Sequence, residues 1–347
     1  MMSKVLLPGI TVVVPTYNRL NYLPQCLDSV LSQDVDGLKV VVVDDASTDG
    51  SLEYLRGLEN TDSRVRIVVN SSNTGSMNKA MQLGIDSCDT EYFTWIGSDD
   101  LYLRHDALRI VVEQHALQKE IDYISFDLKF FHGDDVGSIC NLCGSVWPKE
   151  LGMYSVDRNE AYSPISYAYC VYMSFCPPFP WNGVWKTSFF RKNNITWITY
   201  MENTWSPDTM NGLYFFSKGM KATHLVGTPL IYYRKHKGQD TVSKYTGQKM
   251  RNDITLLYAL YEWFDPESFT KLKFQNDLER HLHLLENIMK QLKLSEKSEV
   301  GIGVLEDCAT DALMFMWKKL RTCMHEPKVI ALEKSFREYI QMCPKKD

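Results

Sequence analysis

The sequence predicts an α/β fold built on a mostly parallel central sheet. Between Ile10 and Phe126, short apolar runs bounded by turn residues alternate with segments whose apolar residues recur every three or four positions. The runs are typical of buried strands, and the recurrence is typical of amphipathic helices. Strands that are apolar throughout and separated by such helices indicate a parallel sheet covered on both faces, with right-handed crossovers.

The expected elements alternate regularly over this part of the chain. Strands are expected at Ile10–Val14, Leu38–Val43, Val65–Val69, Glu91–Ile96 and Ile121–Phe126. Helices are expected at Leu23–Leu31, after the turn and cap residues 46–51, at Met77–Ile85 and at Leu108–His115. Each helix gathers its apolar residues on one face, so each is suited to cover the sheet.

Beyond residue 130 the alternation fades. His132–Asp135 is rich in turn residues, and Tyr162–Trp185 is rich in aromatic residues and proline, which predicts a loop that packs over the sheet edge. A late strand is expected at Leu230–Tyr233. From about Gln248 the apolar spacing becomes helical, and the Asp265-Pro266 pair is a strong helix start.

Composition limits the classes of function. The chain has 347 residues, 44% of them hydrophobic and 23% charged, which is enough for a packed core in one large or two modest domains. The net charge of −5 argues against nucleic-acid binding. Met1–Gly9 is too short for a signal peptide, and no apolar run approaches the roughly 20 residues of a membrane helix. We therefore expect a cytoplasmic protein.

The cysteines and the basic C-terminal stretch each have an ordinary explanation. Nine scattered cysteines are an odd number and are expected to be reduced thiols, and the Cys140/Cys143 pair lacks the second close pair of a zinc site. Trp317–Asp347 has eight Lys or Arg against four Asp or Glu. A solvated helix face and a peripheral contact with an anionic membrane both fit that balance.

Two Asp-Asp pairs each follow an apolar strand. Asp44-Asp45 comes directly after Val40–Val43, and Asp99-Asp100 comes after Glu91–Ile96 and a short Gly97-Ser98 turn. Because open α/β sheets bind ligands outside the carboxyl ends of their strands, both pairs are expected to face one crevice. Adjacent carboxylates repel unless a cation or hydrogen-bond donor lies between them, so a divalent cation and a nucleobase are both candidates.

Each acidic pair also has a simpler interpretation. Asp44-Asp45 can accept hydrogen bonds from a base or a ribose, or can cap the following helix. Asp99-Asp100 suits Mg²⁺ or Mn²⁺ held together with a diphosphate, or can serve as turn residues. Tyr17, after the first strand, can stack on a base or belong to a plain turn. The sequence has no P-loop, dinucleotide-binding or nucleophile-elbow pattern.

Four segments in order resemble a known family, glycosyltransferase family 2, whose fold is called GT-A. The segments are TVVVPTYNR at 11–19, VVVDDASTDGS at 41–51, NTGSMNKA at 73–80 and WIGSDDLY at 95–102. The resemblance is firm over residues 9–125, looser to residue 245 and absent from the C-terminal helices. It implies a GT-A domain over residues 1–245, with a nucleotide-sugar half at 1–125 and an acceptor half at 126–245, followed by a helical C-terminal extension at 246–347.

The resemblance implies an inverting transfer of a sugar from a nucleotide-sugar donor, with UDP as the commonest carrier, to an acceptor hydroxyl. The residues that it assigns to the donor nucleotide are Pro15, Tyr17, Asn18, Asp44, Asp45, Asn73 and Ser98. A divalent cation, Mn²⁺ or Mg²⁺, would be held by Asp99, Asp100 and His236. The first acid of the family's Asp-x-Asp element falls here on Gly97.

The resemblance also assigns residues to catalysis and to the acceptor side. Asp208 corresponds to the general base and Glu202 is the reserve candidate, although Asp208 can equally be a helix cap. The usual Glu beside the base is Pro207 in this chain. Arg234 corresponds to a late Tyr-Arg-x-His segment and is expected near the diphosphate. Trp181 and Trp185 are expected either to shape the acceptor pocket or to pack at the sheet edge.

Two other functions stay open at the level of sequence. The replacements at Gly97 and Pro207 are compatible with a non-catalytic sugar-nucleotide-binding or assembly protein. A nucleotidyltransferase would need a Gly-rich loop with Lys or Arg after the first strand, where this chain has Pro15–Arg19. The acceptor (a glycan, a lipid-linked saccharide or a polysaccharide) and a homo-oligomeric state are also open.

Overall fold

The computed structural model describes residues 7–132, 135–143, 182–197 and 207–236, together with Pro327 and Ile330. The chain divides into two compact units. The first contains Met1–Pro164, Cys176–Thr199 and Pro207–Gln239, and it holds every helix and strand given below. The second contains Ile165–Phe175, Tyr200–Ser206 and Asp240–Asp347. The predicted C-terminal helices therefore lie outside the described residues, and the domain boundary at residue 245 stays a prediction.

The alternating first part of the chain forms the predicted parallel sheet. Its strands are β1 (Leu7–Thr16), β2 (Leu38–Asp44), β3 (Val65–Val69) and β4 (Thr90–Trp95). They lie in the order β3-β2-β1-β4, and each neighbouring pair is parallel. The helices between and after them are α1 (Leu23–Leu31), α2 (Ser51–Thr61), α3 (Met77–Ser87) and α4 (Ala107–Leu117). The fold class and these elements are confirmed.

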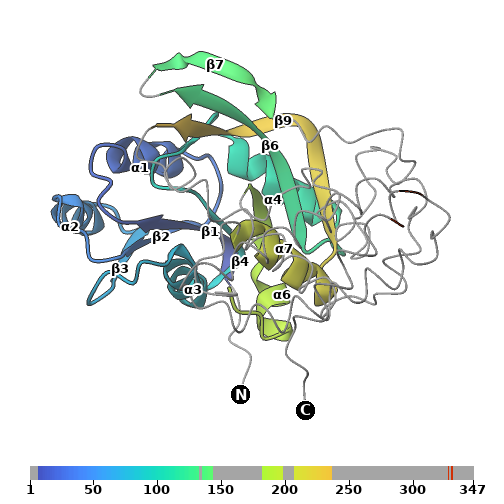
Figure 1. The fold of residues 1–347 in the computed structure, drawn as a ribbon. Helices are drawn as coiled ribbons and strands as arrows, with labels where there is room; N and C mark the ends of the chain where they lie inside the picture. Colours follow the sequence, from blue (N-terminus) through green and yellow to red (C-terminus); the bar gives the residue numbers. More distant parts are fainter. Residues whose placement is uncertain are drawn as a thin grey trace. The chain divides into compact units, whose positions relative to one another are not determined.

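The apolar strands are buried because helices cover both faces of this half of the sheet. Figure 1 shows α1 and α3 on opposite sides of β1 and β2. Val12 and Val14 pack with Leu23 and Leu27 of α1 in the main apolar core. Val13 points the other way, towards α3, where a Cβ added to Gly84 would lie 2.2 Å from Val13 Cγ1. A larger residue at position 84 would therefore push α3 away from the sheet.

The second part of the sheet is mixed. The strands there are β5 (Leu101–Tyr102), β6 (Tyr123–His132), β7 (Asp135–Cys143), β8 (Gly183–Lys186) and β9 (Ala222–Lys235). The order continues as β4-β8-β6-β9-β5, with β7 on β6. Among these described strands, β6 and β9 form the parallel pair, and Figure 1 shows them as long neighbouring strands below β7.

The prediction of a loop through Trp185 was wrong for its last residues, because β8 is an internal strand. β8 pairs with β4 on one side and β6 on the other. Trp185 stacks between Phe93, with ring centroids 5.3 Å apart, and Tyr123, at 4.6 Å. A Cβ added to Gly183 would lie 2.3 Å from Tyr123 Cε2, so a glycine is needed where β8 begins. A strand of four residues gives too short a pattern to be recognised in the sequence.

Two short helices cover the aromatic side of β4, β8 and β6. They are α6 (Thr187–Lys192) and α7 (Pro207–Ser217). Phe190 of α6 packs edge-on against Phe93 at 4.9 Å and lies 5.0 Å from Phe215 of α7. These contacts hold the second half of α7, which contains Phe215, on the aromatic side of the sheet.

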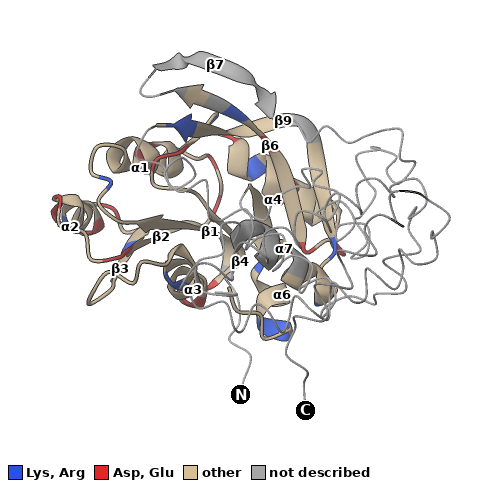
Figure 2. Cartoon of the chain, viewed as in Figure 1, with Lys and Arg blue, Asp and Glu red and all other residues tan. Residues whose placement is uncertain are grey.

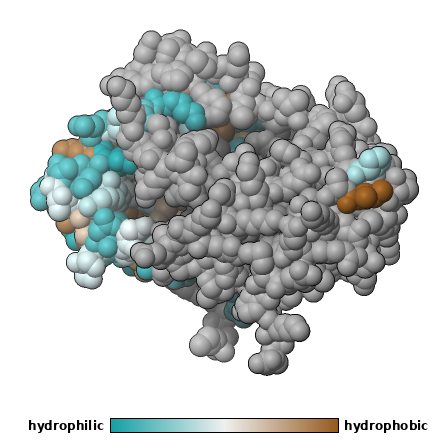
Figure 3. All heavy atoms as spheres, in the orientation of Figure 1, coloured by the Kyte–Doolittle hydropathy of each residue, from teal (hydrophilic) through white to brown (hydrophobic). Residues whose placement is uncertain are grey.

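The surface carries few large apolar side chains in the part that the structure describes. On the face drawn in Figure 3, the coloured area is mostly hydrophilic, with small brown areas. No described helix is long and apolar enough to cross a bilayer. Cys26 and Cys88 are buried free thiols, as expected of reduced cysteines.

Candidate functional site

The topology brings the two Asp-Asp pairs to one edge of the sheet. β1, β2 and β4 run parallel, and Thr16 pairs with Asp44 in the register of β1 and β2. Val13 pairs with Trp95, so the turn that follows β4 leaves the sheet at the same edge. The predicted common edge is confirmed. Figure 2 shows acidic loop segments beside α1 and a basic end to β9 in the same region.

Asp45 is held by neutral donors from the next loop. Its carboxylate accepts hydrogen bonds from Asn70 Nδ2 at 2.6 Å, from the Thr74 main-chain N–H at 3.0 Å and from Thr74 Oγ1 at 3.0 Å. The side chain is 6% exposed. Asp45 therefore fastens the 70–76 loop to the sheet edge, and its predicted contact with the nucleoside stays a prediction.

Asp44 has spare hydrogen-bonding capacity. Its Oδ1 accepts the Ser47 main-chain N–H at 2.9 Å. Its Oδ2 and the hydroxyl of its register neighbour Thr16 are buried without a partner in the described part of the chain. A buried polar atom without a partner is costly, so this pair of atoms is suited to a polar ligand or an ordered water.

The loops after β1 and β2 are tied to each other. Asn18 adopts φ 51°, its main-chain N–H donates to Ser47 Oγ at 2.9 Å, and its Oδ1 accepts from Thr48 N at 2.8 Å. Asp49 accepts from Leu20 N at 3.0 Å and from Ser51. Burial alone would raise the pKa of Asp49, but the hydrogen bonds from Ser51 and Leu20 outweigh it and lower that pKa.

The other predicted nucleotide residues differ in exposure. Tyr17 is 41% exposed, so its ring is available for stacking. Asn73 is exposed, and its Oδ1 accepts the Gly75 N–H at 2.6 Å within its own turn. Pro15 and Ser98 are buried. All four lie on the loops or strand ends at the common edge.

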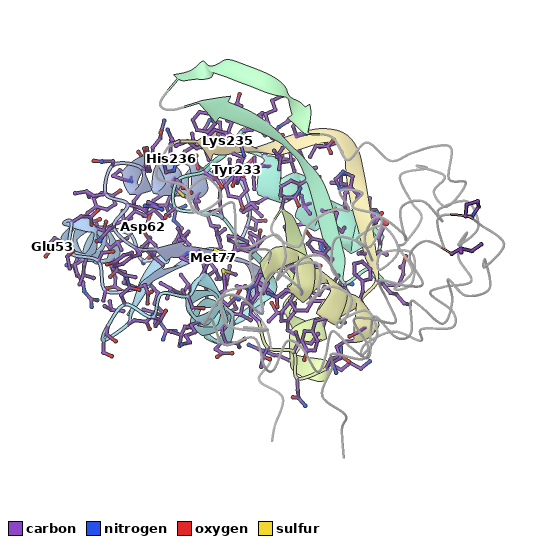
Figure 4. The ribbon with its side chains drawn as sticks, viewed as in Figure 1. Glu53, Asp62, Met77, Tyr233, Lys235 and His236 are labelled. Atoms are coloured by element: carbon purple, nitrogen blue, oxygen red, sulfur yellow. The ribbon has the colours of Figure 1, made fainter. Side chains whose placement is uncertain are left out.

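The Asp99-Asp100 turn is held by β9. His236 Nε2 donates to Asp99 Oδ2 at 2.9 Å, and the Arg234 main-chain N–H donates to Asp100 Oδ1 at 2.9 Å. The His236 ring also lies 4.7 Å from the ring of Tyr22, the residue before α1. Figure 4 shows His236 and Lys235 at the end of β9, beside α1.

The remaining oxygens of this acidic pair converge beside Gly97. A Cβ added to Gly97 would lie 2.9 Å from Asp99 Oδ1 and 3.0 Å from Asp100 Oδ2. The two carboxylates thus occupy the space into which the family's usual acid at this position would extend. Burial, and then the charge of Asp99, raise the pKa of Asp100 well above its ordinary value. The same place would therefore gain from a bound cation.

Asp99 and Asp100 supply some, but not all, of the ligands that a hard divalent cation needs. Neither Asp99 Oδ1 nor Asp100 Oδ2 is taken up by His236 or Arg234, and carboxylate oxygens are the ligands that Mg²⁺ and Mn²⁺ prefer. Among the described residues, no three His, Cys, Asp or Glu side chains are arranged to hold a metal. His236 bonds to Asp99 instead of standing as a third ligand, so a diphosphate and water would have to complete the coordination.

Helix α1 holds the chain from Gly97 to Leu108 through its polar side chains. Cys26 Sγ lies 3.4 Å from the Gly97 carbonyl oxygen, and Ser29 Oγ accepts Tyr102 N at 3.1 Å. Gln33 donates to the Arg104 carbonyl at 2.8 Å and accepts Leu108 N at 3.1 Å. Burial, then the charges of Asp100 and Asp99, raise the pKa of the Cys26 thiol well above its ordinary value, so the thiol stays protonated.

Two predicted acceptor or diphosphate residues are buried. Trp185 is 0% exposed within the aromatic stack, so its assignment to the acceptor pocket was wrong. It packs in the interior of the sheet and not at its edge, because β8 lies between β4 and β6. Arg234 is also 0% exposed, and its guanidinium lies between the rings of Tyr22 and Phe131. This arrangement leaves Arg234 no open path to a diphosphate, contrary to expectation.

The catalytic candidates are only partly described. Pro207 is the first residue of α7, where proline is well tolerated, and Asp208 is the second. The side chain of Asp208 lies outside the described part, as do Glu202 and Trp181 altogether. Their roles stay predictions.

Sequence reasoning missed the residues that support the two acidic pairs. Asn70 and Thr74 hold Asp45, and Tyr22, Gln25 and Phe131 surround Arg234. Thr74 lies within the recognised Asn-Thr-Gly segment and could have been proposed from it. Nothing in the local sequence of Gln25 or Phe131 indicates a contact with a residue so far along the chain.

Known proteins resemble this chain in sequence over its first part. Residues 11–135 match the sequence profile of glycosyl transferase family 2. Glycosyltransferase GlyA of Streptococcus pneumoniae serotype 4 is 34% identical over 131 residues, which cover 35% of this chain and 18% of that relative. The match thus spans about a fifth of the relative's own length.

Solved structures resemble the fold over most of the chain. TarS 1-349 of S. aureus in complex with UDP-GlcNAc has a TM-score of 0.53 at 16% identity, covering 95% of this chain and 91% of that one. The mannosyltransferase PcManGT of Pyrobaculum calidifontis, in complex with GDP-Man and Mn²⁺, has a TM-score of 0.52 at 18% identity, covering 96% and 87%. At these identities the likeness concerns the fold alone.

Proposed function

Because residues 11–135 match the sequence profile of glycosyl transferase family 2, we propose that this chain transfers a sugar from a nucleotide-sugar donor to an acceptor hydroxyl. The observation that carries the proposal is the meeting of two differently supported Asp-Asp pairs at the carboxyl edge of one parallel sheet. Ligands of open α/β sheets bind at that edge. One pair is suited to a nucleoside and the other to a cation-bound diphosphate.

The nucleoside would bind at the ends of β1 and β2. The exposed ring of Tyr17 is available for stacking on the base. The unpartnered Asp44 Oδ2 and Thr16 Oγ1 would bond to polar groups of the base or ribose. Pro15, Asn18 and Asn73 would border the same site, as the family resemblance suggests. UDP is our first candidate, although the two similar structures hold a UDP-sugar and a GDP-sugar.

The diphosphate would bind beside the Asp99-Asp100 turn. Asp99 Oδ1 and Asp100 Oδ2 would hold Mn²⁺ or Mg²⁺, and His236 would keep Asp99 in place through its 2.9 Å hydrogen bond. When bound there, a divalent cation neutralises charge on the departing diphosphate. Ser98, next to the pair, would lie along the same ligand.

Asp208 would act as the general base at the start of α7. It would take the proton of the acceptor hydroxyl while that oxygen bonds to the anomeric carbon and the bond to the nucleoside diphosphate breaks. The nucleoside diphosphate leaves with the electron pair, and the anomeric configuration inverts. Such a base typically contributes about 10²–10⁴-fold to the rate. The acceptor would be a hydroxyl of a glycan, a lipid-linked saccharide or a polysaccharide.

Calorimetric titration of the full chain with UDP, GDP and dTDP, each with Mn²⁺ and with EDTA, tests the donor site. We expect one nucleotide to bind more tightly than the others, and more tightly with Mn²⁺. Binding of none of the three would contradict the proposal and favour a degenerate site. Equal binding with and without Mn²⁺ would exclude the cation site alone.

Asp208→Asn tests the catalytic assignment separately. We expect about 10²–10⁴-fold slower sugar transfer, measured as nucleotide release from the donor in the presence of acceptor, because the hydroxyl then lacks a base. Nucleotide affinity should not change, since Asp208 is assigned to the acceptor side. Glu202→Gln is the matched control, and a loss confined to that variant would move the base to Glu202.

A further inference from the structure

Arg234 contacts both residues of the acidic turn and helix α1. Its main-chain N–H donates to Asp100 Oδ1 at 2.9 Å, and its Nε donates to the Asp99 carbonyl oxygen at 2.7 Å. Its Nη2 donates to Gln25 Oε1 at 2.5 Å. One residue of β9 thus holds the main chain of the turn, one of its carboxylates and helix α1 together.

Two aromatic rings lie close to the Arg234 guanidinium. Its Cζ lies 4.8 Å from the centre of the Tyr22 ring and 4.5 Å from that of Phe131. Cation–π contacts of this kind stabilise a desolvated guanidinium. Tyr22 also packs against His236, which bonds to Asp99. Tyr22, just before α1, therefore supports both Arg234 and His236, the two residues that reach the acidic pair.

The positive charge of Arg234 offsets the repulsion between the carboxylates of Asp99 and Asp100. Asp99 and Asp100 are adjacent, and Asp100 is 5% exposed, so solvent screens their charges poorly. A guanidinium stays protonated at any ordinary pH, and its planar donors keep one orientation. A fixed positive charge beside the turn lets two carboxylates face the same place before any cation arrives.

We propose that Arg234 is a positioning residue for the cation site, clamped by Gln25 and Tyr22. It holds the Asp99-Asp100 turn so that Asp99 Oδ1 and Asp100 Oδ2 converge beside Gly97, and it does not contact the diphosphate. This inference rests on the proposed function of the turn. It differs from a direct phosphate role, in which the guanidinium would have to leave both rings.

A substitution at Gln25 distinguishes a positioning role of Arg234 from a direct contact with phosphate. It is exposed on α1, bonds to Arg234 and touches neither carboxylate. If Arg234 positions the turn, loss of the Gln25 contact loosens the cation site. If Arg234 were a phosphate ligand, loss of that contact would free its guanidinium and would leave binding unchanged or stronger.

The experiment is a titration of the full chain with UDP, GDP and dTDP, with Mn²⁺ and with EDTA, for the wild type, Gln25→Ala and Arg234→Lys. We expect Gln25→Ala to weaken the binding in Mn²⁺ roughly 3- to 10-fold, as for a lost hydrogen bond to a charged group, and to leave the binding in EDTA unchanged. Arg234→Lys keeps the positive charge but loses the planar set of guanidinium donors, so it should weaken the binding in Mn²⁺ more than Gln25→Ala does. Gln114→Ala, on α4, is the matched control and should change neither.

The outcomes are distinct. If Gln25→Ala binds nucleotide in Mn²⁺ as tightly as the wild type does, the proposed positioning role of Arg234 is overturned. Weaker binding in EDTA for Arg234→Lys, with Gln25→Ala unaffected, overturns it in favour of a direct phosphate contact. A wild type that binds no nucleotide, or binds equally with and without Mn²⁺, contradicts the proposed site itself. Should Arg234→Lys fail to fold, the exposed Gln25 still decides the question.

Discussion

The two Asp-Asp pairs have the same sequence and the same place at the end of a parallel strand, but their surroundings differ. Asp44 and Asp45 accept hydrogen bonds from neutral donors at Ser47, Asn70 and Thr74. Asp99 and Asp100 instead accept from His236 and Arg234, more than 130 residues along the chain. Asp45 is held by residues 25 and 29 positions along the chain, whereas the second pair is held by residues at the end of β9, more than 130 positions away.

The difference shows what each pair can do. Neutral donors fix the direction of a carboxylate, which suits recognition of the polar edge of a base or ribose. The positive charge of Arg234 partly offsets the cost of placing two carboxylates together, which is compatible with the proposed cation site. Identical dipeptides thus receive different chemistry from their neighbours.

Removing one charge from each pair should separate two components of nucleotide binding, and this is the largest effect expected. Asp99→Asn should weaken the Mn²⁺-dependent part of nucleoside diphosphate affinity roughly 100-fold, because it removes an anionic ligand and the partner of His236. Asp45→Asn should weaken binding equally with Mn²⁺ and with EDTA. Calorimetric titration measures both, and a metal-dependent loss in Asp45→Asn would contradict the division.

The first pair should matter more for stability. Asp45→Asn should lower the free energy of unfolding by about 2–3 kcal/mol, because an amide cannot accept all three hydrogen bonds that the buried carboxylate accepts. Urea unfolding followed by circular dichroism measures the change. Asp89→Asn, which breaks only the partly exposed ion pair with Lys39, is the control and should cost about 0–1 kcal/mol.

The same substitution in the second pair should act in the opposite direction. Burial and the charge of Asp99 raise the pKa of Asp100, so the folded protein loses stability as the pH rises from the ordinary pKa of an aspartic acid through that raised pKa. Asp100→Asn keeps the acceptor for Arg234 N–H but cannot ionise. In EDTA it should be more stable than the wild type at pH 7, and the difference should shrink on acidification.

Urea unfolding between pH 4 and pH 8 measures this divergence. Addition of Mn²⁺ should stabilise the wild type and leave Asp100→Asn unchanged, since only a native-state ligand shifts the equilibrium. Equal stability of the two proteins at every pH in EDTA would show that Arg234 fully offsets the cost of the buried charge.

The smallest expected effect concerns the turn beside the first pair. Asn18→Ala should lower stability by about 1–2 kcal/mol, because it loses the bond to Thr48 N and places a Cβ residue at φ 51°. Asn18→Gly restores the backbone freedom and should cost less. Thermal unfolding of the two variants compares them, and an equal loss would assign the whole effect to the hydrogen bond.

The sequence determined the first half of the fold because its signals are local. Runs such as Val40–Val43 can only be buried, and the apolar spacing in α1 gives one face to cover them. Asp44-Asp45 and Asp99-Asp100 follow those strands directly, so their common edge was predictable from chain direction alone. The family motifs lie in the same stretch, which is why they could be recognised.

The tertiary structure decided which residues support the acidic pairs. The sequence suggested that Trp185 lines the acceptor pocket. Its ring instead lies in a buried aromatic stack, because β8 lies between β4 and β6. The sequence suggested that Arg234 contacts the diphosphate, but in the structure its guanidinium contacts Tyr22, Phe131 and Gln25. Contacts between segments that are distant in sequence carry no local pattern. The chain alone therefore determines where the two acidic pairs lie, and only the packing of the end of β9 beside α1 determines which residues hold the second pair.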